Sequence, residues 1–257
     1  MGSIFYFCLM GRRKRKPEEF ENIAVTGAGA KGKAIAKAPD GKTLFVRGAV
    51  PGDVVDVRTV KKRKSYYEAI VTRYREWSPD RIPPVCSHFE HCGGCSWQHL
   101  KYEKQLYYKQ NEVEQNLRRI GKLELPEVSP ILGSYEQYYY RNKMEFSFSP
   151  KRWLTPAEIQ SGEEIPPAPA CGFHISGMWD KILDIETCHL QEEPSNAIRN
   201  FVKDKALELG IPFYDPRTRE GLLRGLLLRH TTTGEWMALL QFARNDTGLI
   251  DSLMKAV

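Results

Sequence analysis

The stretch Pro39-Asp-Gly-Lys-Thr-Leu-Phe-Val-Arg-Gly-Ala-Val-Pro-Gly-Asp53 decides the fold of the first part of the chain. It holds two turn signals, Pro39-Asp40-Gly41 and Pro51-Gly52-Asp53, in which proline presets φ and glycine supplies a positive φ. Segments of β-branched or alternating residues lie around these turns, at 23–25, 34–36, 43–46, 53–60 and 68–74. Five short strands without a helical stretch predict a small closed barrel of the oligonucleotide-binding type, because closure removes exposed strand edges.

Charge is unevenly distributed along the 257 residues. Residues 11–75 hold 17 Lys/Arg against 7 Asp/Glu, whereas residues 76–257 hold 21 against 25. Clustered cations gain affinity for an anionic polymer by releasing its counterions, so the basic first part predicts a nucleic-acid partner. The alternative is a solvated basic surface. Residues 1–15 are expected to form a disordered tail. No apolar run has the length of a membrane span, so we expect a cytoplasmic protein that does not bind a membrane.

The most informative motif is Cys86-Ser-His-Phe-Glu-His-Cys92-Gly-Gly-Cys95. Cys92 and Cys95 lie on one tight turn, which Gly93 and Gly94 permit, so both thiolates can face one metal site. Cys86 supplies a third ligand five residues upstream. The motif therefore predicts a metal site that needs one further ligand from elsewhere.

Cys188 and Cys171 are the candidates for the fourth ligand. Three clustered cysteines with a distant fourth favour an iron–sulfur cluster, because structural zinc sites usually draw their ligands from two close pairs. A mixed zinc site is the main alternative, and the absence of any metal is a second one. Nearby histidines that could serve such a zinc site are His88, His91 and His99.

A long helix and a second β-rich region are predicted after this motif. The helix covers residues 100–121 and carries an apolar stripe at helical spacing, which must pack against something. Its members are Tyr102, Leu106, Val113, Leu117 and Ile120. Alternation predicts strands near 138–148, 171–175 and 181–185, and a hairpin at 222–229 and 235–242. A second helix is expected over 195–209, with Ile198, Phe201, Val202 and Leu209 on its inner face.

Gly27-Ala-Gly-Ala-Lys-Gly32 matches the dinucleotide-binding pattern G-x-G-x-x-G. That pattern needs a following helix inside a βαβ unit, and the turn at Pro39 arrives too soon for one. The glycines therefore predict a barrel loop, on which Lys31 and Lys33 could contact phosphate. No βαβ alternation and no nucleophile–base pair are recognisable in the rest of the sequence, so no catalytic residue is predicted.

Several of these segments together resemble the bacterial RNA uracil-5-methyltransferases, which carry a TRAM domain and an iron–sulfur cluster. The matching segments are Lys33-Ala-Ile-Ala, Asp40-Gly41, Val50-Pro-Gly-Asp53, the cysteine motif with Gln98-His99, Tyr140-Arg-Asn-Lys143 and Asp184-Ile-Glu-Thr-Cys188-His-Leu. The relatives that act on 23S ribosomal RNA are the most similar in these motifs. The resemblance implies a [4Fe–4S] cluster on Cys86, Cys92, Cys95 and Cys188, and leaves Cys171 as a spare thiol.

The fold class expected from pattern and resemblance is α+β and mainly β. It consists of an N-terminal OB-like TRAM barrel and a β-rich Fe–S central domain, with the Rossmann-like methyltransferase domain absent. The expected divisions are a tail at 1–15, the barrel at 16–75, the cysteine connector at 76–99, a helix at 100–122 that would pack on the missing catalytic domain, the central domain at 123–245 and the start of a truncated catalytic region at 246–257. S-adenosylmethionine is then expected only in the full-length enzyme, and this chain alone is expected to be inactive.

The expected function is the RNA-binding and cluster-holding part of an S-adenosylmethionine-dependent enzyme that forms 5-methyluridine in 23S ribosomal RNA. The expected partner is structured RNA, and the chain is expected to be a monomer. Candidate RNA contacts are Lys31, Lys33, Arg47, Lys61, Lys62, Arg63, Lys64, Arg141 and Lys143. The alternative function is a stand-alone Fe–S or zinc RNA-binding accessory protein without catalysis.

Overall fold

A computed structural model of the chain describes residues 16–257. The expected tail, with Cys8 in it, lies outside the described residues. The chain forms two compact units, which we describe separately. Unit 1 holds the described residues up to Arg81 together with Leu100–Pro126, and unit 2 holds Ile82–His99 and Glu127–Val257. Among the described residues, no helix is both long enough and apolar enough to cross a membrane.

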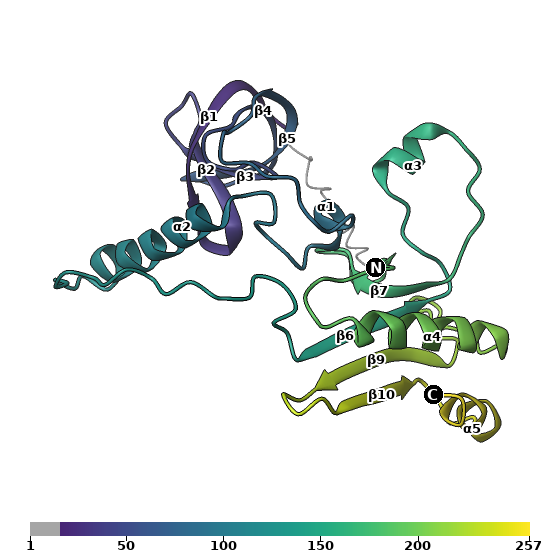
Figure 1. Cartoon of the computed structure of the whole chain (residues 1–257). Coiled ribbons are helices and arrows are strands. Elements are labelled where there is room, and N and C mark those ends of the chain that lie inside the picture. Colours follow the sequence, from purple (N-terminus) through teal and green to yellow (C-terminus); the bar gives the residue numbers. More distant parts are fainter. Residues whose placement is uncertain (1–15) are drawn as a thin grey trace, which may run out of the picture. The chain divides into compact units, whose positions relative to one another are not determined.

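Unit 1 is built around a closed five-stranded barrel with strand order β1-β2-β3-β5-β4 (Figure 1). The strands are β1 (Glu19–Gly29), β2 (Lys33–Lys37), β3 (Thr43–Arg47), β4 (Val54–Lys62) and β5 (Tyr66–Glu76). β3 and β5 pair in parallel, and the other neighbours, including the closing pair β1 and β4, are antiparallel. Inward-facing aliphatic residues such as Leu44, Val46 and Val57 are fully buried and form the barrel core.

The two predicted turns form where the proline and glycine signals stand. Gly41 donates its N–H to the Ala38 carbonyl at 2.9 Å and adopts a φ of +82°, so the chain reverses from β2 into β3. Gly52 has a φ of +93°, and a Cβ built there would lie 2.7 Å from Ser78 Oγ. Both the backbone angle and the lack of space therefore require glycine at position 52.

The glycine-rich segment is a β-hairpin, as its early turn signal predicts. β1 runs to Gly29, a short 3-10 turn follows at Ala30–Gly32, and Gly29 pairs with Lys33 at the start of β2. The segment is thus not followed by the helix that a dinucleotide-binding turn requires.

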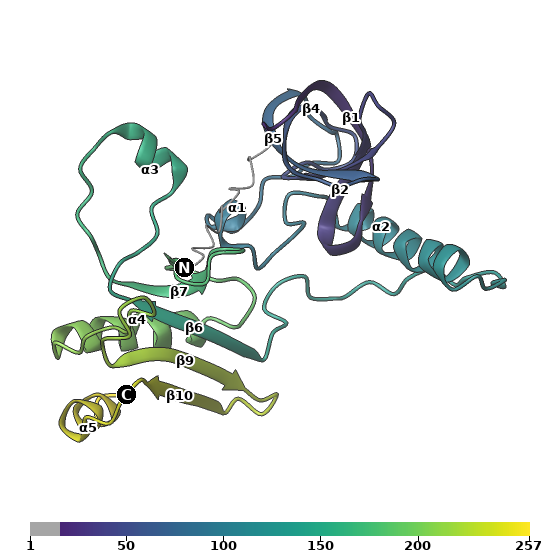
Figure 2. The same ribbon diagram turned by 180° about the vertical axis from the view of Figure 1, so that it is seen from behind.

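The helix predicted over 100–121 forms as α2 (Tyr102–Gln115), continued by a π-helical turn (Asn116–Ile120). α2 begins beside the barrel and extends away from it in both ribbon views (Figures 1 and 2). Its apolar stripe is largely exposed: Val113 is 56% and Ile120 is 78% accessible. The packing partner that the stripe predicts is therefore not found among the described residues.

Unit 2 contains a five-stranded antiparallel sheet with strand order β10-β9-β6-β7-β8. Its elements are α1 (Phe89–Cys92), β6 (Lys143–Ser149), α3 (Pro156–Ser161), β7 (Ala170–His174), β8 (Ile182–Asp184), α4 (Pro194–Glu208), β9 (Leu223–His230), β10 (Trp236–Phe242) and α5 (Thr247–Met254). Both ribbon views show α4 running along the sheet (Figures 1 and 2). Side chains of α4 and α5, including Val202 and Leu253, share one apolar core with the sheet.

The inner face of α4 differs from the predicted one. Phe201, expected inside, is 49% exposed, whereas Arg199 is wholly buried. Burial lowers the pKa of the Arg199 guanidinium, which lies over the Phe146 ring at 5.1 Å and donates hydrogen bonds to its neighbours. These partners allow the Arg199 guanidinium to be buried, although its Nε has no hydrogen-bond partner among the described residues.

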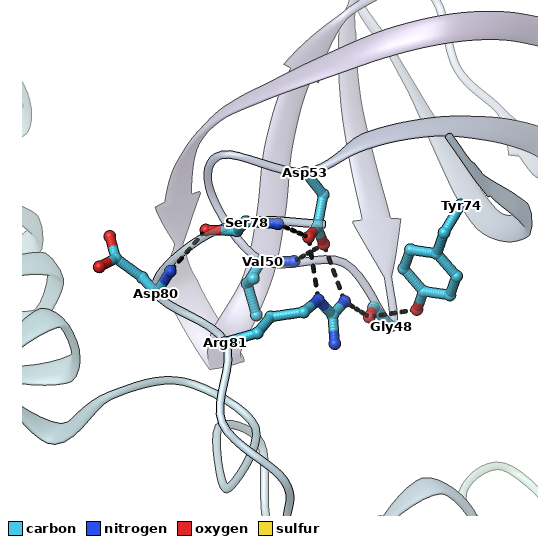
Figure 3. Close-up of polar contacts among 7 residues, drawn as sticks. All are labelled: Gly48, Val50, Asp53, Tyr74, Ser78, Asp80 and Arg81. Atoms are coloured by element: carbon cyan, nitrogen blue, oxygen red, sulfur yellow. Dashed lines mark hydrogen bonds and ion pairs between the residues drawn. The ribbon is translucent and has the colours of Figure 1, made fainter. Parts of the chain in front are cut away.

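Asp53, which lies just before β4, binds the segment that follows β5 in unit 1 (Figure 3). Its buried carboxylate accepts hydrogen bonds from the Val50 N–H at 2.7 Å, the Ser78 N–H at 2.9 Å, and Arg81 through Nε at 2.9 Å and Nη2 at 2.8 Å. A carboxylate that is fully desolvated needs such a complete set of donors. The contacts tie the turn before β4 to the segment that follows β5.

We expect Asp53→Ala to lower the free energy of unfolding of the barrel by about 3–5 kcal/mol, because it leaves the Arg81 guanidinium without its partner. Urea unfolding, with amide exchange in β4 and β5 as the local probe, measures the loss. Glu21→Ala is the control, since the Glu21 side chain is 74% exposed and meets only Arg75 at 3.6 Å. Equal losses in the two variants would show that Asp53 is not the constraint on the barrel.

Candidate functional site

Four cysteines of unit 2 line one cavity of about 350 Å³. Cys86, Cys92 and Cys95 come from the loop that contains α1, and Cys188 lies between β8 and α4. Gly93 follows α1 with a φ of +71°, so the chain reverses at once and brings Cys95 back to the cavity. The structure therefore brings together the four cysteines that the motif and the resemblance single out.

Around this cavity Cys188 is buried, and Cys86, Cys92 and Cys95 are partly buried. Burial raises the pKa of Cys92 to about 11, and it also raises the pKa of Cys95 and of Cys188. Interactions among the thiols raise the pKa of Cys92 further, which shows that the four groups lie within electrostatic reach of one another. Such a group of thiols becomes anionic only when a cation supplies compensating charge.

The described side chains do not form a ready-made site for a metal ion. Within residues 16–257, no three His, Cys, Asp or Glu side chains are arranged to hold one metal ion. The histidines expected for a mixed zinc site, His88, His91 and His99, do not line the cavity, whereas His174 and His189 do.

Cys171, the other candidate for a fourth ligand, does not line this cavity. It lies on β7, is wholly buried, and its N–H donates to Asp184 Oδ1 at 2.8 Å. Burial raises the pKa of the Cys171 thiol to about 12, so it stays neutral. Cys171 is thus a packed core residue.

Gln98 holds two of the cysteines from within the motif. Its Oε1 accepts a hydrogen bond from the Cys86 N–H at 3.1 Å, and its Nε2 donates to Cys95 Sγ at 3.2 Å. The side chain therefore connects the two ends of the cysteine loop. Sequence reasoning included Gln98 in a motif without giving it a role; the signal was its position three residues after Cys95.

Asn196 and Arg199 on α4 hold the distant cysteine. Asn196 Oδ1 accepts from the Cys188 N–H at 2.8 Å, and Asn196 Nδ2 donates to the Cys188 carbonyl at 3.3 Å. Arg199 Nη1 donates to the same Asn196 oxygen at 2.9 Å, and its Nη2 donates to the Glu186 carbonyl. Sequence reasoning missed both residues, because nothing in the pattern of an amphipathic helix marks a buried asparagine and arginine.

The predicted RNA contacts lie on both units. Lys31 occupies the hairpin turn with a φ of +62°, and Arg47 is exposed at the end of β3. Lys61 and Lys62 are the last two residues of β4, and Arg63 and Lys64 lie in the turn that follows. In unit 2, Arg141 lines the cysteine cavity, and Lys143 begins β6 and bonds Glu145 at 2.9 Å.

Besides Lys143, three of these lysines, all in the barrel, are paired with carboxylates. Lys33 and Lys61 both approach Glu68, at 3.8 and 3.4 Å, and Lys62 pairs with Glu18. All these groups are partly exposed, and exposed ion pairs are weak and screened by salt. The pairs therefore reduce the local positive charge without preventing the lysines from contacting another anion.

Comparison with known proteins connects this geometry to RNA methylation. Residues 14–72 match the TRAM domain family. Among the relatives are proteins described as uncharacterized RNA methyltransferases, from Bacteroides thetaiotaomicron (52% identical over 211 residues, 82% of this chain and 46% of the relative) and Porphyromonas gingivalis (43% over 240 residues, 91% and 51%). The homologues of the chain are thus RNA methyltransferases, and its N-terminal module is a TRAM domain. The chain spans about half the length of these relatives.

A solved structure shares the fold. The chain is similar to Pyrococcus abyssi tRNA (uracil-54, C5)-methyltransferase in complex with S-adenosyl-L-homocysteine, with a TM-score of 0.59 and 23% sequence identity. The match covers 90% of this chain and 48% of that one.

The expected absence of a methyltransferase domain is corrected by this match: over 90% of its length the chain shares the fold of part of a solved methyltransferase, of which it covers 48%. The expectation rested on the lack of a recognisable βαβ pattern in one sequence, and a missing pattern carries less weight than a matched fold.

We expect Asn196→Ala to lower the free energy of unfolding by about 1–3 kcal/mol, because it leaves buried backbone groups of Cys188 without partners. Amide exchange should accelerate at Cys188 in particular, as measured by mass spectrometry of the peptide that contains it. Asn200→Ala is the matched control on the same helix, since Asn200 makes a more exposed bond of 3.2 Å to the Glu186 carbonyl. A similar response of Cys188 to both variants would contradict the role given to Asn196.

Proposed function

We propose that this chain acts in the 5-methylation of uridine in RNA, with S-adenosylmethionine as the methyl donor, and that it contributes the RNA-binding barrel and a cluster-bearing domain. The observation that carries the proposal is its similarity, over 82–91% of its length, to RNA methyltransferases. The fold shared with a uracil-C5 enzyme supports the choice of base. The alternative of a stand-alone accessory protein has no comparable support.

We further propose that Cys86, Cys92, Cys95 and Cys188 hold a [4Fe–4S] cluster. The support is the donor set itself, because four thiols around one cavity match the ligands of such clusters. The cluster would join the loop around α1 to the segment before α4, and so hold together parts of the chain that are distant in sequence. Gln98 and Asn196 would fix the orientation of its ligands.

The proposed substrate is structured RNA, in particular large-subunit ribosomal RNA, bound by a monomer in the cytoplasm. The support is the TRAM domain and the basic character of residues 11–75. Phosphate contacts position a protein on RNA and are shared among many side chains. The proposed contacts are Lys31, Lys33, Arg47, Lys61, Lys62, Arg63, Lys64, Arg141 and Lys143. The division into a barrel at 16–75, a connector at 76–99 and a central domain at 123–245 stays a prediction.

Anaerobic purification should yield a brown protein with about four iron atoms per chain and a broad visible absorption near 400 nm, as a [4Fe–4S] cluster requires. We expect Cys92→Ser and Cys188→Ser to lose most of this iron. Cys171→Ser is the matched control and should keep it, because Cys171 does not line the cavity. Stoichiometric zinc without iron in the purified protein would contradict the cluster.

Deletion of the gene tests the methylation itself. Nucleoside mass spectrometry of ribosomal and transfer RNA should show the loss of one 5-methyluridine in the large-subunit RNA, restored by the gene on a plasmid. A loss confined to transfer RNA would keep the reaction and overturn the ribosomal substrate. An unchanged 5-methyluridine content in both RNAs would contradict the proposed function.

A further inference from the structure

An exposed aromatic stack follows the last strand of the barrel. Tyr74 lies near the end of β5 and Trp77 directly after it, and their rings stack with centroids 4.0 Å apart at an angle of 14°. Trp77 is 62% exposed, which is unusual for the largest apolar side chain. An exposed indole of this kind, held in one orientation by a stacked partner, is a feature of recognition surfaces.

Arg81 contacts both rings of the stack, and Figure 3 shows it with Tyr74 and Asp53. Its guanidinium carbon lies 4.8 Å from the Tyr74 ring centroid and 4.7 Å from that of Trp77, while its Nε and Nη2 bind the buried carboxylate of Asp53. Because Arg81 is about equally far from both rings, it does not lie across the second face of the indole. Tyr74 covers one face of Trp77, and the exposure of the side chain is therefore concentrated on the other.

The backbone beside this stack is held by hydrogen bonds. The Tyr74 hydroxyl and Arg81 Nη2 both donate to the Gly48 carbonyl, each at 2.8 Å. Gly48 follows Arg47, whose exposed side chain was among the predicted phosphate contacts. The same hydrogen bonds that hold the rings thus fix the backbone next to Arg47.

We propose that Trp77 is a stacking platform for an unpaired RNA base, with Arg47 contacting the adjacent phosphate. This rests on the proposed RNA-binding function and specifies which form of RNA the barrel takes. A flat, rigid ring with one open face gains nothing from phosphate alone, whereas every unpaired base offers a π face to it. A paired base is already stacked in its helix, so the platform selects single-stranded segments and loops.

Binding of the purified chain to a single-stranded RNA decamer and to a duplex of the same length tests the platform by fluorescence anisotropy and tryptophan quenching. Trp77→Ala should weaken binding of the single strand by roughly 5- to 100-fold, the range that base–aromatic stacking supplies. The slope of log affinity against log salt concentration should be the same for the Trp77→Ala variant and the unchanged protein, because the phosphate contacts stay in place. Trp77→Phe should retain part of the affinity, and binding of the duplex should be unchanged.

Trp179→Ala is the matched control, since Trp179 is 64% exposed and lies in unit 2. It should bind the single strand as the unchanged protein does. If Trp77→Ala binds the single strand within twofold of the unchanged protein, or loses duplex binding equally, the platform is wrong while RNA binding stands. If the unchanged protein binds neither RNA at low salt, both the platform and the proposed function fail.

Discussion

The buried carboxylate of Asp53 is the constraint on which unit 1 depends. A desolvated charge is tolerated only when its hydrogen-bonding capacity is filled, and four N–H donors from three residues fill it here. The donors come from the turn before β4 and from the chain after β5, so the contact holds both ends of the last hairpin. The same contact orients Arg81 and thereby the aromatic pair Tyr74 and Trp77. Stability of the barrel and the geometry of its exposed surface thus depend on one group.

Unit 2 follows the same physical principle at the cysteine cavity. A loop without regular structure leaves backbone groups unpaired unless side chains satisfy them. Asn196, which accepts a hydrogen bond from the buried Arg199, binds both the N–H and the carbonyl of Cys188. Gln98 accepts a hydrogen bond from the Cys86 N–H. The cysteines are therefore held in position by hydrogen bonds that do not require a bound group. Such preorganisation lowers the cost of assembling a multi-ligand site, because the ligands need not be ordered during binding.

The features that could be predicted from the sequence are those with a local physical cause. Turns at Gly41 and Gly52 follow from the need for positive φ, and the expected helix at 195–209 agrees with α4 within one residue at each end. Arg199 could not be placed, because apolar periodicity assumes that charged side chains face water, and its burial depends on carbonyl and amide partners from elsewhere in the chain.

Ion pairs between residues on different strands could not be predicted from sequence patterns either. Lys61 approaches Glu68 through the register of β4 with β5, which shifts at three irregularities, whereas Lys33 approaches it from β2 through the pairing of β2 with β3 and of β3 with β5. A register shift of one residue moves a side chain to the opposite face of a strand, so no local pattern fixes such a contact. The prediction that a methyltransferase domain is absent was wrong for a different reason. It rested on the lack of a recognisable βαβ pattern, and the structural match contradicts it.

On the proposed RNA-binding surface of the barrel, charged side chains and the aromatic stack would contribute in different ways. Lys33, Lys61 and Lys62 are paired with carboxylates, and an incoming phosphate must compete with Glu68 and Glu18 for them. Because exposed pairs of this kind contribute little, the competition is mild, and the lysines supply affinity that falls with salt and ignores sequence. Stacking on the indole depends on neither salt nor phosphate, and it requires an unpaired base. In the proposed complex, discrimination between paired and unpaired RNA would therefore come from the aromatic stack, and the basic residues would contribute affinity that does not depend on base pairing.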